Sequence, residues 1–187
     1  MPECFYHITS RGNRKEPLFL NHLDYRAFFH ILQKIHEKIP LEFASFCIMS
    51  NHFHLQLRSQ QASISKVMAL LNKRYANYYN TRYRLTGHVF ENRFFSSLIE
   101  DRAGMLQVSK YIHLNPVKAG MVKKPEDYAW SSYRFYHQEI KNNLPSYINI
   151  YALLDLFEGT LAEKQHQYNQ GLSITLERMN DEQTTNL

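Results

Sequence analysis

The sequence predicts an α+β fold in which an antiparallel sheet carries two helices on one face. Segments with the two-residue alternation of strands and segments with the 3.6-residue spacing of helices follow one another in the order βαββαβ. That order is the split pattern of ferredoxin-like folds. A further helix follows the sixth element, and we expect it to pack on this frame.

Turn and capping residues set the expected boundaries. The predicted elements are, in chain order, a strand over 4–11, a helix over 22–38, strands over 41–49 and 52–58, a helix over 63–83, a strand over 93–99 and a helix over 102–115. The short link Ser50-Asn51 predicts a hairpin. Ser63 and Asp101 are expected N-caps. Pro116 is expected to end the last helix at Asn115, because proline donates no backbone hydrogen bond.

Two regions are expected along the chain. Residues 1–138 contain all seven predicted elements and form the main domain. Residues 139–187 form a C-terminal helical extension, in which 149–170 make two short helices and 171–187 are frayed.

Composition favours a polyanionic partner. The formal net charge is +5, and 13 tyrosines and 12 phenylalanines accompany 22 lysines and arginines. Aromatic faces among cations suit unpaired bases and their phosphate backbone, although a tyrosine-rich core gives the same composition. No apolar run approaches the roughly 20 residues of a membrane helix, and the N-terminus lacks a signal-peptide pattern, so we expect a cytoplasmic protein. Cys4 and Cys47 stand alone, which argues against a zinc–thiolate site.

The segment His52-Phe53-His54-Leu55-Gln56-Leu57-Arg58 has two chemically distinct faces. Side chains alternate along a strand, so both histidines, the glutamine and the arginine share one face, and the three apolar residues share the other. Two imidazoles on one strand face can hold a divalent cation and leave positions open for phosphate oxygens. The alternative is a solvent-facing strand with two incidental histidines. A third ligand must come from elsewhere, and an oxygen donor would suit Mg²⁺ or Mn²⁺.

The helix predicted over 102–115 offers a nucleophile and an oxygen ligand. Tyr111 and Asn115 are four residues apart and therefore share a helix face. If that helix face packs against the strand face that carries the histidines, the phenol and the amide oxygen both lie beside the two imidazoles. The alternatives are a tyrosine that only packs and an asparagine that only caps the helix.

Five motifs together resemble a known family. They are Phe5-Tyr6-His7-Ile8-Thr9-Ser10-Arg11-Gly12-Asn13, Met49-Ser50-Asn51-His52-Phe53-His54-Leu55, Gly87-His88-Val89-Phe90 with Arg93-Phe94, Tyr111-Ile112-His113-Leu114-Asn115-Pro116-Val117-Lys118-Ala119-Gly120, and Trp130-Ser131-Ser132-Tyr133. They resemble the single-tyrosine HUH (histidine–hydrophobe–histidine) transposases, which move small insertion sequences. The resemblance is strongest to the branch associated with repetitive extragenic palindromes, and it covers about residues 4–136 in the expected order.

The resemblance implies an HUH nuclease fold, substrates of single-stranded DNA with hairpins, and a divalent cation, Mg²⁺ or Mn²⁺. It makes His52 and His54 the metal ligands and Tyr111 the nucleophile, which would form a 5′-phosphotyrosine and release a 3′-OH. Asn115 stands where related transposases have a metal-binding glutamine, with a side chain one methylene shorter. Glu91-Asn92 departs from the Gln-Gly that the family pattern has before the arginine. Relatives act as monomers or as homodimers.

Basic residues are the expected DNA contacts, although a solvated surface position is the alternative for each of them. They are Arg11, Arg14, Lys15, Lys73, Arg74, Arg82, Arg84, Arg93, Lys118, Lys123 and Lys124. Lys110 or Lys118 is a candidate to activate the tyrosine. Tyr75, Tyr78, Tyr79 and Tyr83 are candidates to stack on bases, and the first two also fit the apolar stripe of their helix.

Two other functions remain open from the sequence. One is a domesticated relative that recognises palindromic DNA repeats without strand transfer. The other is a ferredoxin-like RNA-binding protein, in which aromatic residues of the sheet stack on bases. The strands here carry histidine and glutamine on the polar face instead of such aromatics.

Overall fold

The computed structural model describes residues 3–137 and 144–185 and contains the predicted antiparallel sheet. Its four strands are β1 (Tyr6–Arg11), β2 (Glu42–Ile48), β3 (His52–Arg58) and β4 (Phe95–Leu98), arranged in the order β2-β3-β1-β4. This is the order of a ferredoxin-like sheet, so the predicted fold class is confirmed. β1 and β3 occupy the centre, and the predicted β2–β3 hairpin is present.

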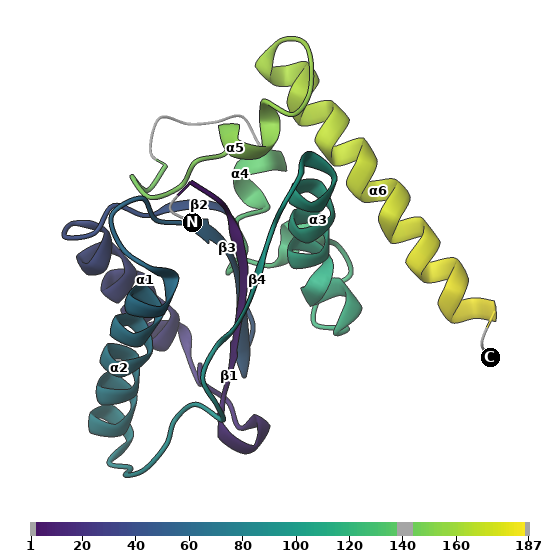
Figure 1. The fold of residues 1–187 in the computed structure, drawn as a ribbon. Helices are drawn as coiled ribbons and strands as arrows, with labels where there is room; N and C mark the ends of the chain where they lie inside the picture. Colours follow the sequence, from purple (N-terminus) through teal and green to yellow (C-terminus); the bar gives the residue numbers. More distant parts are fainter. Residues whose placement is uncertain (1–2, 138–143, 186–187) are drawn as a thin grey trace.

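The helices form layers on both faces of the sheet (Figure 1). α1 (His22–His36) and α2 (Ile64–Tyr83) cover one face, while α3 (Arg102–Lys118) covers the other, with α6 (Leu161–Thr185) outside it. The short elements are η1 (Asn13–Lys15), η2 (Pro125–Asp127), α4 (Arg134–His137) and α5 (Tyr151–Leu154). No helix of the described residues is long and apolar enough to cross a bilayer.

The alternation along β3 explains the two layers. Phe53, Leu55 and Leu57 are fully buried against α1 and α2, where the ring of Phe28 lies 5.0 Å from that of Phe53. The opposite face carries the polar side chains and lies toward α3. The polar face is therefore sandwiched between the sheet and α3, at the place where the two histidines point.

The predicted N-caps are confirmed at both helices. Ser63 accepts a hydrogen bond from the backbone N–H of Lys66, and Asp101 accepts one from Gly104. Pro116 does not end α3, contrary to the sequence prediction. The helix continues to Lys118. The proline lies in its last turn, and the N–H of Ala119 still donates a hydrogen bond to the carbonyl of Asn115.

The tyrosines of α2 serve the packing of α2 on α1. Tyr75 is fully buried and donates a hydrogen bond to the carbonyl of Leu18, so it has no face to offer a base. Tyr78 and Tyr83 both donate to the buried carboxylate of Asp24, which also caps α1. For Tyr75 the alternative is therefore confirmed: its ring is part of the core, in the apolar stripe of its helix.

The C-terminal region is more ordered than the sequence predicts. The expected boundary at 138/139 falls outside the described residues, so the division stays a prediction. α6 is one continuous helix to Thr185, and the expected fraying of 171–187 is wrong over its described part. The reason is an apolar stripe that includes Tyr168, Leu172 and Met179, which packs α6 against the rest of the core.

A buried histidine ties α3 to two other segments. His113 Nδ1 lies 2.7 Å from Tyr168 Oη on α6, and its Nε2 lies 2.8 Å from Ser132 Oγ. Ser132 in turn accepts a hydrogen bond from the backbone N–H of Phe46 in β2. α3 is thus fixed to the sheet on one side and to α6 on the other.

The substitution His113→Ala is expected to lower the free energy of unfolding by about 2–4 kcal/mol, because it opens a cavity and leaves two buried hydroxyls without their partner. Urea denaturation followed by circular dichroism measures this loss. The matched control is His30→Ala on the exposed surface of α1, where about 0.5 kcal/mol or less is expected. Equal losses in the two variants would show that the buried histidine does not anchor α3.

Candidate active site

The register of the two central strands assembles the polar face. Thr9 of β1 pairs with His54 of β3, and Arg11 pairs with His52. His7, two residues earlier on β1, belongs to the same face because side chains alternate. Two strands that are 40 residues apart in the chain therefore contribute one set of side chains.

Each metal-ligand candidate has one ring nitrogen already engaged. His54 Nδ1 lies 3.1 Å from Thr9 Oγ1 and 3.1 Å from His7 Nε2. His52 Nδ1 lies 2.7 Å from Asn51 Oδ1, which can only accept, so this nitrogen carries the proton. Such contacts fix the orientation of both imidazoles, and for His52 also the tautomer, and they leave the two Nε2 atoms available to bind a metal.

Burial keeps these imidazoles neutral. It lowers the pKa of His54 to about 3, and the neighbouring His52 and His7 lower it further. Burial also lowers the pKa of His52, with an added contribution from the charge of Arg11. Neutral imidazoles have a free lone pair at neutral pH, which a metal ion requires of a histidine ligand.

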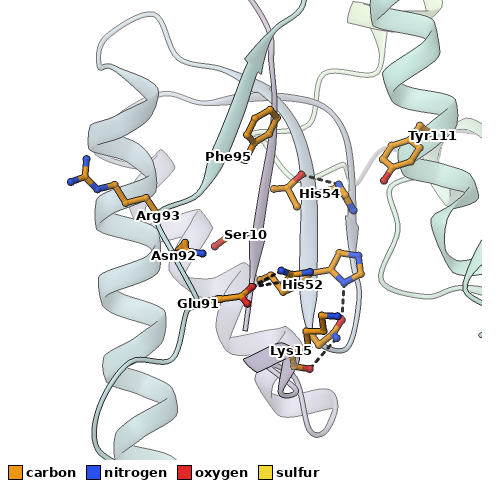
Figure 2. A pocket seen from close by; sticks show the side chains of 12 residues that line it. Ser10, Lys15, His52, His54, Glu91, Asn92, Arg93, Phe95 and Tyr111 are labelled. Carbon is orange, nitrogen blue, oxygen red and sulfur yellow. Dashed lines mark hydrogen bonds and ion pairs between the residues drawn. The ribbon is translucent and has the colours of Figure 1, made fainter. Parts of the chain in front are cut away.

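Tyr111 reaches the histidines from α3, as Figure 2 shows. The centroid of its ring lies 5.3 Å from that of His54 and 5.8 Å from that of His7, both in edge-to-face geometry. The tyrosine is 44% exposed, although its neighbour Ile112 is fully buried. The packing of α3 thus leaves the phenol open beside the imidazoles, which is the spatial meeting that the sequence could not establish.

Asn115 lies one turn further along α3 and is only 9% exposed. Its Nδ2 has no hydrogen-bond partner among the described residues. It is absent from the residues that line the cavity beside His52 and His54. Its role as a metal ligand therefore stays a prediction.

A cavity of about 520 Å³ opens beside the histidines (Figure 2). His52, His54 and Tyr111 line it, and three of the predicted DNA contacts join them: Arg11, Lys15 and Arg93. The amide of Asn51 holds the Lys15 segment in place by donating to its carbonyl oxygen. The cavity is therefore open, basic and adjacent to the tyrosine.

The remaining predicted DNA contacts lie outside this cavity. Lys73 lines an adjacent hollow of about 460 Å³, which shares Arg93 with the cavity. Lys118 lies on the other side of Tyr111, and Arg82 forms an ion pair with the buried Asp24. The other five lie around η1, along α2 or after α3: Arg14, Arg74, Arg84, Lys123 and Lys124. The structure thus gathers four of the eleven on one side of the tyrosine.

The contacts of Glu91 explain why this chain has a glutamate where the family pattern has a glutamine. Its Oε2 accepts from Arg11 Nε at 2.7 Å and lies 2.6 Å from Arg11 Nη2. The carboxylate therefore holds the guanidinium at the wall of the cavity, beside His52. A neutral glutamine would hold it less firmly, since it has no charge to offer.

His7 and Thr9 are site residues that the sequence analysis did not single out. The signal was present, because His7, Thr9 and Arg11 alternate with Ile8 along the first strand. Combining that alternation with the strand order of a ferredoxin-like sheet places them beside the two histidines.

The donor chemistry fits a divalent cation only in part. The two free Nε2 atoms are suitable ligands that face an open cavity. Among the described residues, however, no group of three or more histidine, cysteine, aspartate or glutamate side chains is placed to hold a metal ion. Further ligands must therefore be amide, water or phosphate oxygens.

A ferredoxin-like sheet that presents two strand histidines to a helix tyrosine is the arrangement that the resemblance to the single-tyrosine HUH transposases implies. Comparison with known families agrees, since the model of the family described as "Transposase IS200 like" matches residues 1–115. The chain therefore belongs to the IS200-like transposase family.

This chain is similar to two REP-associated tyrosine transposases. One is a REP-associated tyrosine transposase of Haemophilus influenzae (strain Rd), 29% identical over 117 residues, which are 56% of this chain and 64% of that protein. The match thus spans less than two thirds of the relative's length. The other is the solved structure of a REP-associated tyrosine transposase bound to a REP hairpin. It has a TM-score of 0.62 and 20% identity, covers 72% of this chain and 79% of the other, and shows the shared fold.

In the metal-free protein, the imidazole of His54 is expected to stay neutral down to about pH 3, because burial and the two neighbouring histidines disfavour its protonation. An NMR titration of the histidine rings measures this. His52→Ala should raise the pKa of His54, since a neighbouring imidazole is lost. A ring of His54 that protonates near the ordinary value of about 6.5 while the protein is still folded would contradict the described burial.

Proposed function

We propose that this protein cleaves and rejoins single-stranded, hairpin-containing DNA through a 5′-phosphotyrosine at Tyr111, with Mg²⁺ or Mn²⁺ held by His52 and His54. One observation carries the proposal: the half-exposed Tyr111 lies beside His54, with ring centroids 5.3 Å apart, at the edge of an open basic cavity.

The cation would supply charge neutralisation on the phosphate and polarisation of a non-bridging oxygen. The chain's own part is to present two neutral Nε2 atoms, with His52 oriented by Asn51 and His54 by Thr9. Asn115 is proposed as an oxygen ligand, because it lies one turn after Tyr111 on the same helix.

The chemical step requires Tyr111 Oη to attack phosphorus in line with the leaving oxygen. A bond forms between Oη and phosphorus, and the bond from phosphorus to the 3′-oxygen breaks. The phenol loses a proton, and the leaving 3′-oxygen takes one up. Because the phosphotyrosine ester keeps the reactivity of the broken bond, another 3′-OH can attack it and rejoin the strands.

Positive charge on the cavity wall stabilises the phosphate as it is attacked. Arg11 is fixed there by Glu91, and Lys15 and Arg93 line the same space. The adjacent hollow shares Glu91, Asn92 and Arg93 with the cavity and adds Lys73. Together they form a track on which a DNA backbone could lie, and the solved relative bound to a REP hairpin supports hairpin DNA as the partner.

A DNA-binding protein without strand-transfer activity is the second candidate. The open basic cavity alone would serve it, whereas two oriented imidazoles beside an exposed phenol would have no use. RNA recognition through exposed sheet aromatics is disfavoured, because α3 covers the polar face of β2 and β3.

Incubation with labelled hairpin single-stranded DNA and Mn²⁺ is expected to give a covalent protein–DNA adduct on a denaturing gel. Tyr111→Phe should abolish the adduct, at least about 100-fold, because the nucleophilic oxygen is lost while the ring remains. The matched control is Tyr151→Phe, which removes another exposed phenol, on α5, and should leave the adduct unchanged. Binding of the DNA by the wild-type protein without any adduct would favour the second candidate.

Metal binding can be tested apart from activity. His52→Ala and His54→Ala are each expected to weaken Mn²⁺ binding by about 10-fold or more in isothermal titration calorimetry, since each removes one of two imidazole ligands. His30→Ala, on the exposed surface of α1, should bind Mn²⁺ as the wild type does. Unchanged affinity in both site variants would rule out the proposed ligands.

A further inference from the structure

A second cavity lies on the other side of Tyr111, between α3 and α6. Its volume is about 510 Å³, and its apolar lining includes Leu106 and Leu114 of α3 and Met179 of α6. We call it the α3–α6 groove. Tyr111 lines both this groove and the cavity beside the histidines, so the two spaces adjoin at the tyrosine.

Cations border the apolar lining of the groove. Lys110 and Lys118 both line it, each from α3. Lys110 extends toward α6 rather than into solvent, since a β-carbon at Gly171 would stand only 2.8 Å from its Nζ. The absence of a side chain at Gly171 thus allows an ammonium group to lie over the backbone of α6, at the wall of the groove.

This combination matches the chemistry of one nucleotide. An unpaired base is a flat, largely apolar surface with polar edges, and its phosphate is anionic. The groove offers apolar side chains for the ring, Gln107 and Thr175 for polar edges, and two ammonium groups for a phosphate. A volume of about 510 Å³ is within the range of small-ligand sites.

The position of the groove next to the candidate active site selects DNA among the possible occupants. A strand whose phosphate reaches Tyr111 must continue on both sides of that phosphate. On one side it meets the basic cavity and Arg11; on the other, the α3–α6 groove is the adjoining space. A second copy of this chain would bring its own excess of positive charge against Lys110 and Lys118, which disfavours it.

We propose that the α3–α6 groove binds an unpaired nucleobase next to the phosphate that Tyr111 attacks, while Lys110 and Lys118 hold the neighbouring phosphate. This inference rests on the proposed function, because it places the base relative to the nucleophile. The groove is thereby a subsite that requires single-stranded DNA, since a base paired in a duplex cannot enter it.

The test compares two fluorescein-labelled probes of equal length in fluorescence anisotropy: an oligothymidylate and an abasic deoxyribose-phosphate strand. The wild-type protein should bind the oligothymidylate more tightly. Met179→Glu should lower the affinity for the oligothymidylate about five-fold or more, by analogy with the loss of one stacked base. The matched control is Ile174→Glu, which adds the same charge to the same helix at an exposed position. It should change the affinity for both probes equally, and by less than Met179→Glu changes the affinity for the oligothymidylate.

A second pair of variants guards against misfolding. Met179→Ala shortens the apolar lining without adding charge and should lower the preference for the oligothymidylate, while Met179→Leu should keep it. Thermal unfolding by circular dichroism verifies that all variants remain folded.

Two results of the anisotropy experiment would overturn the groove proposal: equal affinity of the wild type for the two probes, or equal losses in Met179→Glu and Ile174→Glu. A Met179-dependent dimer in sedimentation experiments would also overturn it, since the groove would then be an interface between copies. Failure of the groove proposal can be distinguished from failure of the proposed function. If the Tyr111 adduct forms without any base preference, the groove proposal fails alone. If the base preference is present without an adduct, cleavage fails and the groove remains a base-binding site.

Discussion

The register between β1 and β3 is the constraint on which the site depends. It places Thr9 opposite His54 and Arg11 opposite His52, so one residue orients an imidazole and another adds positive charge beside it. A slip of one residue would turn every one of these side chains to the other face. The register is secured by that other face, where Ile8 and Leu55 are fully buried. The hydrophobic core thus holds the catalytic candidates in place from the side that they do not occupy.

The second constraint is the position of α3. His113 joins it to Ser132, which is bonded to β2, and to Tyr168 on α6. A fully buried, neutral imidazole in this place fixes the rotation of the helix about its axis, and the rotation decides which residues face solvent. Tyr111, two residues earlier, is left half-exposed beside the histidines as a consequence. The same packing leaves the α3–α6 groove beside the part of α6 where Tyr168 and Leu172 are buried.

These two constraints give the phenol a different environment on each side. Toward β1 and β3 lie neutral imidazoles and the guanidinium of Arg11, which suit a phosphate and a cation. Toward α6 lies an apolar lining bordered by ammonium groups, which suits a base. Glu91 contributes by fixing Arg11, and this explains how an acidic residue can line a cavity that is proposed to receive a polyanion. Under the proposed function, the site is a passage for a single strand with Tyr111 at its centre.

The sequence by itself determined the element order, the two faces of β3 and the caps at Ser63 and Asp101, because these depend on local alternation, spacing and hydrogen bonds. The resemblance in five motifs also singled out His52, His54 and Tyr111, whose roles stay predictions. The sequence alone misjudged Pro116, which does not end α3, and it left open whether Tyr75 stacks on a base or packs in the core. Only the tertiary structure decided that His7 and Thr9 join the site, that Tyr111 faces the histidines and that Asn115 lies buried outside the cavity. These facts depend on strand order and on how α3 is rotated, and both are set by side chains distant in the chain.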